Sequence, residues 1–243
     1  MVELGVLSPI ILSPDEHGCP VKDKLTDLRK RIAQKKCDSI ILSALDDIMC
    51  EWRLRLLNIR GFDIKYNPLA YSYVLVTPSE VHLFMDKADD VVRNSYLTVL
   101  QLGFPFGKLF YSAVRKYLES EGVTLHPYAD AYDFMTKWYE QQAGLNKHKP
   151  RVFVPRNTNY LFGQIFETSA VVDGSPVQVM KGVKNPVELE GMRNSHIRDS
   201  AALVSFLMWL EMEILEGRLY SEIEVASKIE SMRAALDKYV GLR

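Results

Sequence analysis

The sequence predicts an α/β protein, in which a mixed sheet flanked by helices is followed by a long helix. Short apolar runs typical of buried strands alternate with stretches whose apolar residues recur every three or four positions. Two of the strand-like runs are separated by a Pro-Ser turn, which indicates an antiparallel pair. Residues 184–214 combine helix-capping residues with a wide apolar face, which indicates a long helix after the sheet.

The elements of the sheet region follow from these two periodicities. An amphipathic helix is marked by Val21, Leu25, Leu28 and Ile32, and the apolar run at 39–43 suits a buried strand. Later elements are predicted as a helix at 45–59, a turn-rich connection at 60–68, strands at 70–77 and 80–86, helices at 90–102 and 110–119, a strand at 123–126, a helix at 129–142, a strand at 151–155, a helix at 160–166 and a strand at 176–180.

The long helix has a well-defined start. Asn185 can cap it, Pro186 suits the first helical position, and Glu188 completes a capping box. Burying its apolar face needs a large partner such as a sheet, yet only one further helix, at 221–236, is predicted. The best domain boundary therefore falls at 182–185. The apolar face consists of Leu189, Met192, Ile197, Leu203, Val204, Leu207, Met208, Leu210 and Ile214.

Composition narrows the possible partners and the compartment. The 30 basic and 31 acidic residues leave a net charge of −1, which favours neither nucleic acid nor an anionic membrane as a partner. The three cysteines, Cys19, Cys37 and Cys50, form no CxxC pair and are interpreted as free thiols of a reducing compartment. The longest apolar run, at 201–210, is too short to span a bilayer, and the N-terminus is a poor signal peptide. We therefore expect a cytoplasmic protein.

Common catalytic motifs are missing from the sequence. It contains no GxGxxG or GxxxxGK[ST] phosphate loop, no GxSxG and no HExxH. His196 and Asp199 share a helix face, but two neighbours without further ligands make no metal site, and such a pair is common on a solvated face. For His82 and His126 we expect structural roles.

The stretch IRGFDIKYNP, residues 59–68, holds the candidate site residues Arg60, Asp63 and Asn67. Glycine, an Asx-type turn former and Asn-Pro together describe a tight loop whose side chains bond to their own backbone. The alternative is a loop that faces a neighbouring domain or a substrate. The sequence leaves both interpretations open.

Three blocks of the sequence, at 25–48, 56–86 and 183–211, resemble successive blocks of the cytosolic Xaa-Pro aminopeptidase (aminopeptidase P) family. They read LTDLRKRIAQKKCDSIILSALDDI, LLNIRGFDIKYNPLAYSYVLVTPSEVHLFMD and VKNPVELEGMRNSHIRDSAALVSFLMWLE. Their order is that of the family, whose long form has two creatinase-like N-terminal domains before a catalytic pita-bread domain. One departure is the stretch CEWRLR at 50–55, which looks like an insertion and puts the geometry of the following loop in doubt.

The resemblance implies two domains. Residues 1–183 correspond to the second creatinase-like N-terminal domain, a creatinase/prolidase-type mixed sheet flanked by helices. Residues 184–243 correspond to the opening helices of an incomplete pita-bread domain. The partner sheet for the long helix would then belong to a segment that this chain does not contain.

The resemblance also implies a metal-assisted hydrolysis that removes the N-terminal residue from peptides with proline in the second position. Family members hold two divalent metals, usually manganese, through two Asp, one His and two Glu, all beyond the segment that corresponds to residues 239–242. No catalytic or metal-binding residue of the family can therefore be placed on this chain. We expect this polypeptide to be inactive alone, the parent enzyme to bind proline-containing peptides, and a homodimer to be possible. The alternative is a non-catalytic creatinase-like module that binds peptides or a protein.

Overall fold

The computed structural model describes residues 10–13, 18–49, 56–61, 63–64, 67, 69–85, 106–145 and 149–239. Side chains within this set are described except at 10, 106–112 and 145. The chain divides into two units, Met1–Lys184 and Asn185–Arg243.

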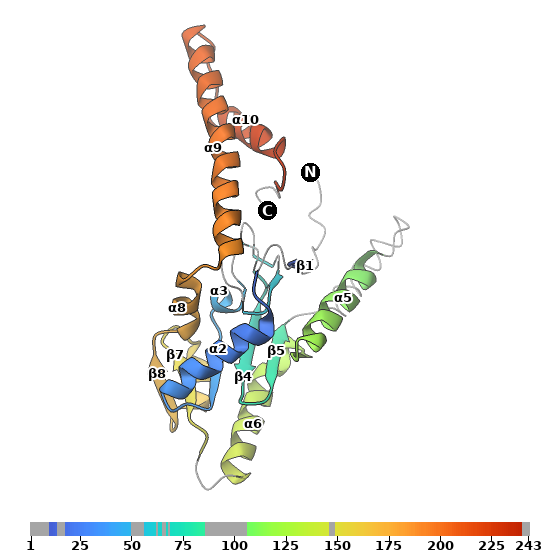
Figure 1. Cartoon of the computed structure of the whole chain (residues 1–243), viewed down its shortest axis with the longest axis vertical. Helices are drawn as coiled ribbons and strands as arrows, with labels where there is room; N and C mark the ends of the chain where they lie inside the picture. Colours follow the sequence, from blue (N-terminus) through green and yellow to red (C-terminus); the bar gives the residue numbers. More distant parts are fainter. Residues whose placement is uncertain are drawn as a thin grey trace. The chain divides into compact units, whose positions relative to one another are not determined.

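The first unit contains a six-stranded mixed sheet in the order β6-β5-β4-β2-β7-β8 (Figure 1). Two antiparallel pairings, β4 with β5 and β2 with β4, lie at its centre, and the pairs β5–β6, β2–β7 and β7–β8 are parallel. A separate two-stranded sheet joins β1 to β3. The strands are β1 (Ile10–Ile11), β2 (Ser39–Leu42), β3 (Ile59–Arg60), β4 (Ser72–Val76), β5 (Val81–Met85), β6 (Thr124–His126), β7 (Val152–Pro155) and β8 (Ala170–Asp173).

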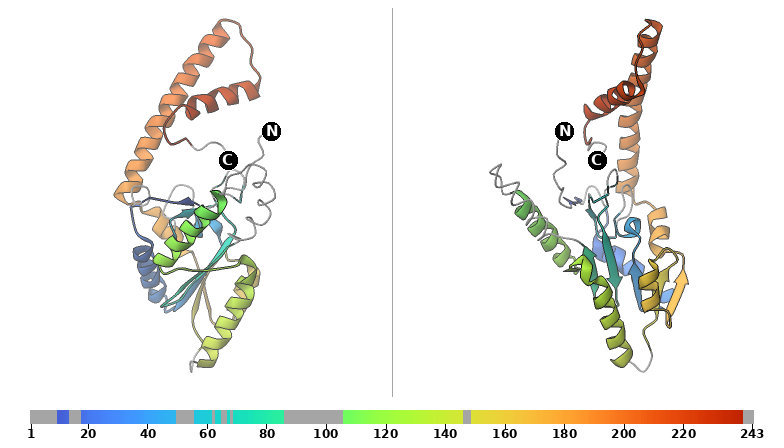
Figure 2. Two further views of the ribbon diagram at one scale, coloured as in Figure 1. Left: turned by 90° about the vertical axis from the view of Figure 1, so that its right-hand side faces the viewer. Right: turned by 180° about the vertical axis from the view of Figure 1, so that it is seen from behind.

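Helices cover both faces of the six-stranded sheet, with α2 on one side and α6 on the other (Figure 2). Successive residues of a strand point to opposite faces, so Ile40 and Leu42 pack in the core with α2, α5 and α8, whereas Ile41 packs with α6 and α7. Burial on both faces explains why β2 reads as a continuous apolar run. The helices of this unit are α2 (Val21–Gln34), α3 (Leu45–Ile48), α5 (Phe106–Ser120), the 3-10 helix η1 (Tyr128–Asp130), α6 (Ala131–Leu145), α7 (Tyr160–Ile165) and α8 (Pro176–Gly182).

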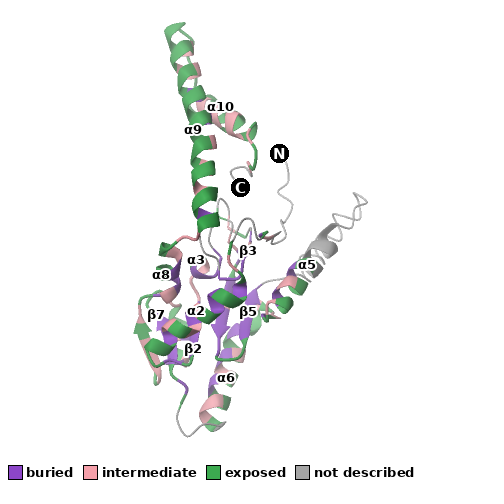
Figure 3. Cartoon of the chain, in the orientation of Figure 1, coloured by how far each residue is buried: buried purple, intermediate pink, exposed green. Residues whose placement is uncertain are grey.

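The second unit is a pair of helices, α9 (Pro186–Leu215) and α10 (Glu222–Ala234). The predicted capping box is confirmed, since the Asn185 side chain accepts from the Glu188 N–H and the Glu188 carboxylate accepts from the Asn185 N–H. Much of α9 is exposed (Figure 3), including large apolar side chains of its predicted apolar face. Met208, for example, is 61% exposed.

Two predicted elements of the first unit are wrong. Within the predicted helix at 45–59, α3 ends at Ile48 and Met49 is extended, whereas Ile59 lies in β3 after Asn58, whose φ of 54° interrupts regular structure. Residues 50–55 lie outside the described part of the chain. The predicted strand at 176–180 is the helix α8, with Pro176 in its first turn, and the strand before it, β8, was not predicted. The predicted helix at 90–102 lies outside the described residues, as does Cys50. Cys37 is a buried free thiol, and Cys19 is half-buried.

Candidate functional site

The three candidate residues of the predicted loop lie around one turn. Arg60 is half-buried at the end of β3, where it pairs with Ile10, and Asp63 and Asn67 are exposed in the turn that follows. The turn closes through backbone bonds, because the Asp63 N–H donates to the Leu69 carbonyl and the Asn67 N–H donates to the Ile64 carbonyl. These contacts match the expected tight loop.

The Asp63 side chain stabilises this turn directly. Its carboxylate accepts a hydrogen bond of 2.8 Å from the Tyr71 N–H, just before β4. At the other end, Gly61 approaches Ala70 so closely that a β-carbon added at Gly61 would lie 2.2 Å from the Ala70 β-carbon. Asp63 and Gly61 thus hold the shape of the loop. That the loop faces a neighbouring domain or a substrate stays a prediction.

The pair His196 and Asp199 is not assembled into a metal site. The Asp199 carboxylate accepts two bonds, of 2.6 and 3.2 Å, from the guanidinium of Arg233, which joins α9 to α10. His196 is exposed on α9. Among the residues that the structure describes, no group of three or more His, Cys, Asp or Glu could hold a metal ion.

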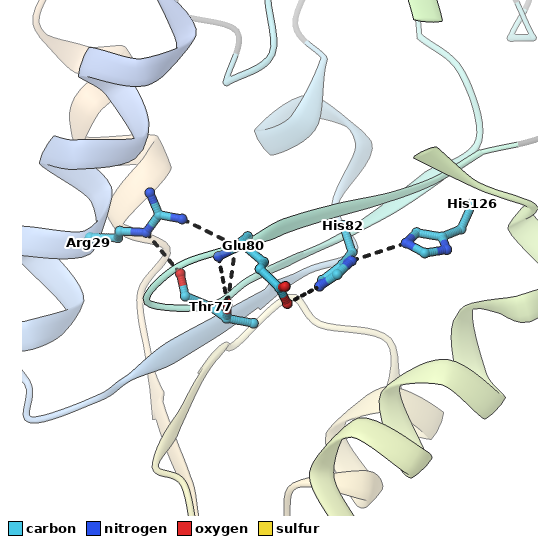
Figure 4. A network of polar contacts seen from close by, with 5 residues as sticks. All are labelled: Arg29, Thr77, Glu80, His82 and His126. Atoms are coloured by element: carbon cyan, nitrogen blue, oxygen red, sulfur yellow. Dashed lines mark hydrogen bonds and ion pairs between the residues drawn. The ribbon is translucent and has the colours of Figure 1, made fainter. Parts of the chain in front are cut away.

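A network of polar side chains that the sequence did not predict lies at the β5–β6 edge of the sheet (Figure 4). His82 of β5 is 7% exposed, and its Nδ1 lies 3.1 Å from Nε2 of His126 on β6. The Nε2 atom of His82 lies 3.2 Å from the Glu80 carboxylate, in the turn between β4 and β5. The Arg29 guanidinium of α2 donates to the carbonyls of Thr77 and Glu80, which fixes that turn.

Aromatic rings enclose the two imidazoles. Phe134 of α6 packs against both rings with centroids 4.7 Å away, and Phe84 stacks on His126 at 4.9 Å. Burial lowers the pKa of His82, against an opposing effect of Glu80. Burial and, secondly, the neighbouring His82 lower the pKa of His126, which Asp130 opposes. Both rings are therefore held in a site that favours their neutral forms.

A second unpredicted cluster surrounds Asp47, beyond the carboxyl ends of the parallel strands β2, β7 and β8. Asp47 is 1% exposed, and neither of its carboxylate oxygens forms a hydrogen bond. The buried hydroxyl of Ser175, which lies near this carboxylate, likewise forms none. The Lys181 ammonium lies 3.9 Å from the Asp47 carboxylate and donates to the neighbouring Asp46 at 3.1 Å. Burial raises the pKa of Asp47, while the nearby Ser175 hydroxyl opposes this shift.

Sequence signals for these two clusters are weak. A histidine within a buried strand was visible at His82, but its partner follows from the parallel pairing of β5 with β6, which sets Phe84 opposite His126. Likewise, Asp47 meets Ser175 only because β2 and β8 flank the same strand, β7. Strand order therefore decides both clusters, and no local pattern encodes it.

Comparisons with known proteins add family information to this geometry. The model of one protein family, the Creatinase/Prolidase N-terminal domain, matches residues 6–188. The chain is similar to the Xaa-Pro aminopeptidase app-1 of Caenorhabditis elegans, with 41% identity over 96% of this chain and 34% of the relative. Another Caenorhabditis elegans relative, the protein pid-5, is 32% identical over 96% of this chain and 20% of its own length. The chain thus spans about a third or less of these relatives.

A solved structure is similar over the same range. The crystal structure of the X-prolyl aminopeptidase from Caenorhabditis elegans, described as a cytosolic enzyme with a di-nuclear active site, superposes with a TM-score of 0.82 at 40% identity. The superposition covers 96% of this chain and 34% of that one. Among the described residues, no helix has the length and apolar character needed to cross a membrane.

Proposed function

This chain belongs to the creatinase/prolidase N-terminal domain family, and we propose that it is a fragment of an Xaa-Pro aminopeptidase. The similarity to the Caenorhabditis elegans enzyme, at 41% identity over 96% of this chain, carries the proposal. The substrates of the whole enzyme would be peptides with proline in the second position, and the reaction would be hydrolysis of the bond before that proline.

The two units support a division of this part into two domains. We assign residues 1–183 to the second creatinase-like N-terminal domain, and residues 184–243 to the opening helices of a catalytic pita-bread domain. The division of the chain at Lys184 and the exposed apolar side chains of α9, including Leu203 and Leu207, support this assignment. The remainder of a catalytic domain would cover that apolar surface.

The described residues do not fit a two-metal centre. No group of three or more potential ligands could hold a metal ion among the residues that the structure describes. We therefore derive no metal-dependent step for this chain. Two divalent metals, manganese by resemblance, would bind in the part of the enzyme that this chain does not span, and they would activate water for the attack. The chain alone would then be inactive, and the parent enzyme would be cytoplasmic.

The loop of Arg60, Asp63 and Asn67 has a place in this proposal. Its backbone is fixed by bonds within the turn, while the side chains of Asp63 and Asn67 are exposed. A rigid turn with exposed polar groups is suited to contact a neighbouring domain or a bound peptide. We propose that this loop faces the catalytic domain of the parent enzyme. As a separate proposal, the parent enzyme would form a homodimer.

The proposal is tested on the native protein of cells that express this sequence. An antibody raised against the chain is used for an immunoblot and for immunoprecipitation. The precipitate is assayed with a peptide that has proline in its second position, with and without added Mn²⁺. The same peptide with alanine in that position is the control substrate.

Two outcomes separate the alternatives. A band well above 27.8 kDa whose precipitate cleaves only the proline peptide supports an aminopeptidase in which this chain is a part. A sole band at 27.8 kDa whose precipitate cleaves neither peptide contradicts the proposal and favours a non-catalytic binding module.

A further inference from the structure

Among the residues that the structure describes, β6 lies at the edge of the six-stranded sheet and pairs with β5 alone. It contains only three residues, Thr124–His126. A strand this short has few ladder bonds, so contacts between side chains contribute much of what holds it in place. The contact between His82 of β5 and His126 of β6 joins the two strands through their side chains.

The protons of the two rings can be assigned from their partners. The Nε2 atom of His82 faces the Glu80 carboxylate, which when ionised only accepts, so this nitrogen carries a hydrogen. A neutral His82 then has a lone pair on Nδ1, and the facing Nε2 of His126 must donate to it. The neutral network is therefore a chain of two donors that ends on Glu80.

A first proton is compatible with this network, but a second is not. The first proton can add to Nδ1 of His126, which leaves both hydrogen bonds intact. A second proton must add to Nδ1 of His82, where it would face the N–H of His126 across 3.1 Å. The bond between the rings is then lost, and two cations lie side by side.

Few other charges act on the pair. Glu80 acts from the β4–β5 turn and Asp130 from η1, and both favour protonated rings. From α6 the residue in ring contact is the apolar Phe134, and Arg29 of α2 binds backbone carbonyls of the turn. Two carboxylates can thus accommodate the first positive charge, whereas two facing N–H groups oppose the second.

We propose that His82 and His126 form a proton-operated latch, which holds β6 on β5 when at most one ring is protonated and releases β6 when both are. The lowered pKa values of both rings agree with this direction. The two histidines bind protons more tightly when β6 is released than when β6 is paired with β5. The paired state is therefore stable above the ordinary histidine pKa of 6.5 and loses stability as pH falls below it.

Hydrogen–deuterium exchange of the full chain between pH 7.5 and 5.0 tests the latch. After correction for intrinsic exchange, protection of peptides that span residues 123–131 is expected to fall as pH drops. The equilibrium constant for opening of β6 should rise by about tenfold per pH unit for each proton taken up on opening. With two protons taken up, the rise is up to about 100-fold for each unit by which the pH falls. Peptides from β2 and β7 should keep their protection over this range.

Matched variants identify the groups responsible. His126→Gln keeps an amide donor near the position of Nε2 but cannot titrate, so its opening constant should change by at most about tenfold per pH unit. His196→Gln removes an exposed histidine of α9 and should behave like the unaltered chain. An unchanged pH profile in His126→Gln, or equal loss of protection in β2 and β7, would overturn the latch.

Nitrogen NMR of the histidine rings provides a measurement that needs no variant. At pH 7.5 the latch requires an unprotonated Nδ1 on His82 and a protonated Nε2 on His126. On acidification the two rings should titrate in two coupled steps. If both rings titrate independently in single steps, or if the opposite tautomers are found, the latch is wrong even where His126→Gln fails to fold.

Discussion

Asp47 is a buried carboxylate that is poorly compensated. Its buried carboxylate has no hydrogen bond, and the Lys181 ammonium at 3.9 Å is shared with Asp46. Burying a carboxylate without full compensation costs free energy, which appears here as a raised pKa. The folded chain thus holds this proton more tightly than the unfolded chain. Stability is lost as pH rises from the ordinary value of 3.8 through the raised pKa.

Replacing Asp47 by Asn should therefore stabilise the protein at pH 7. The amide carries no charge, and its N–H groups can donate to the unpaired hydroxyl of Ser175. We expect the free energy of unfolding in urea to rise by about 1 kcal/mol at pH 7, with a smaller gain near pH 4. Asp46→Asn, at the exposed neighbour, should change it by less than about 0.5 kcal/mol. A loss of stability in Asp47→Asn would mean that the carboxylate is satisfied by a group that binds there.

A glycine is required at position 61 because the backbone there lies very close to Ala70. Its added β-carbon would lie 2.2 Å from the Ala70 β-carbon and 2.4 Å from the Ala70 nitrogen, so the backbone must move. We expect Gly61→Ala to lower the free energy of unfolding by about 3 kcal/mol, measured by urea denaturation. Gly163→Ala in α7 meets no atom within 4 Å and should be neutral or stabilising by up to about 1 kcal/mol. Equal effects of the two substitutions would contradict this geometry of the loop.

At the scale of elements, the pairing of β4 with β5 depends on a contact from outside the sheet. The turn between them contains Thr77 and Glu80, whose carbonyls accept from the Arg29 guanidinium at 2.9 and 3.2 Å. Within the turn, the Glu80 N–H donates to the Thr77 hydroxyl. The helix α2 thereby fixes the hairpin, although the two are about fifty residues apart in the chain.

Arg29→Met should loosen this turn while keeping the apolar stem of the side chain. Loss of the two bonds is expected to lower the free energy of unfolding by about 1–2 kcal/mol and to increase amide exchange at residues 77–81. Lys30→Met, at the exposed next residue of α2, should have little effect on either measurement. Unchanged exchange in Arg29→Met would show that the turn is held by its own bonds.

The wrong prediction at 176–180 has a physical cause. A short run of apolar residues is compatible with either a strand or one face of a helix. The structure forms α8 because Val177 and Met180, three residues apart, both reach the core. In contrast, α9 was predicted nearly to the residue because its capping box is local, and α10 confirms the helix predicted at 221–236.

At the scale of the whole molecule, the second unit exposes a large apolar surface. On α9, Val204 is 56% exposed, Leu207 53% and Met208 61%. Several large apolar side chains exposed on one helix are typical of a region that contacts another protein surface. The same apolar residues were predicted to need a large partner, and the paired helix α10 does not bury them.

The isolated chain is therefore expected to self-associate as its concentration rises. The double substitution Val204→Lys and Met208→Lys should shift sedimentation toward the monomer, with the unfolding free energy changed by less than about 0.5 kcal/mol. Asn194→Lys adds a charge to an exposed polar position of α9 and should leave association unchanged. A chain that stays monomeric at every concentration would argue against a docking role for this surface.

The sequence by itself determined the α/β class, the β4–β5 hairpin, the amphipathic α2, the capping box of α9 and the family resemblance. Each of these features depends on residues that are close together in the chain. They are the spacing of apolar residues, a turn between two strands, and a capping box whose two residues are three positions apart. It also placed the candidate loop, where Asp63 forms the local turn bond that its residue type favours.

Only the tertiary structure decided the strand order, the His82–His126 contact and the burial of Asp47. These features join residues that are far apart in the chain, such as β5 with β6 and Asp47 with Ser175. Their free energy comes from packing on both faces of the sheet and from the loss of solvent around polar groups. Packing on both faces and the loss of solvent arise only when the strands are assembled. Sequence patterns alone therefore predicted no more than structural roles for the two histidines.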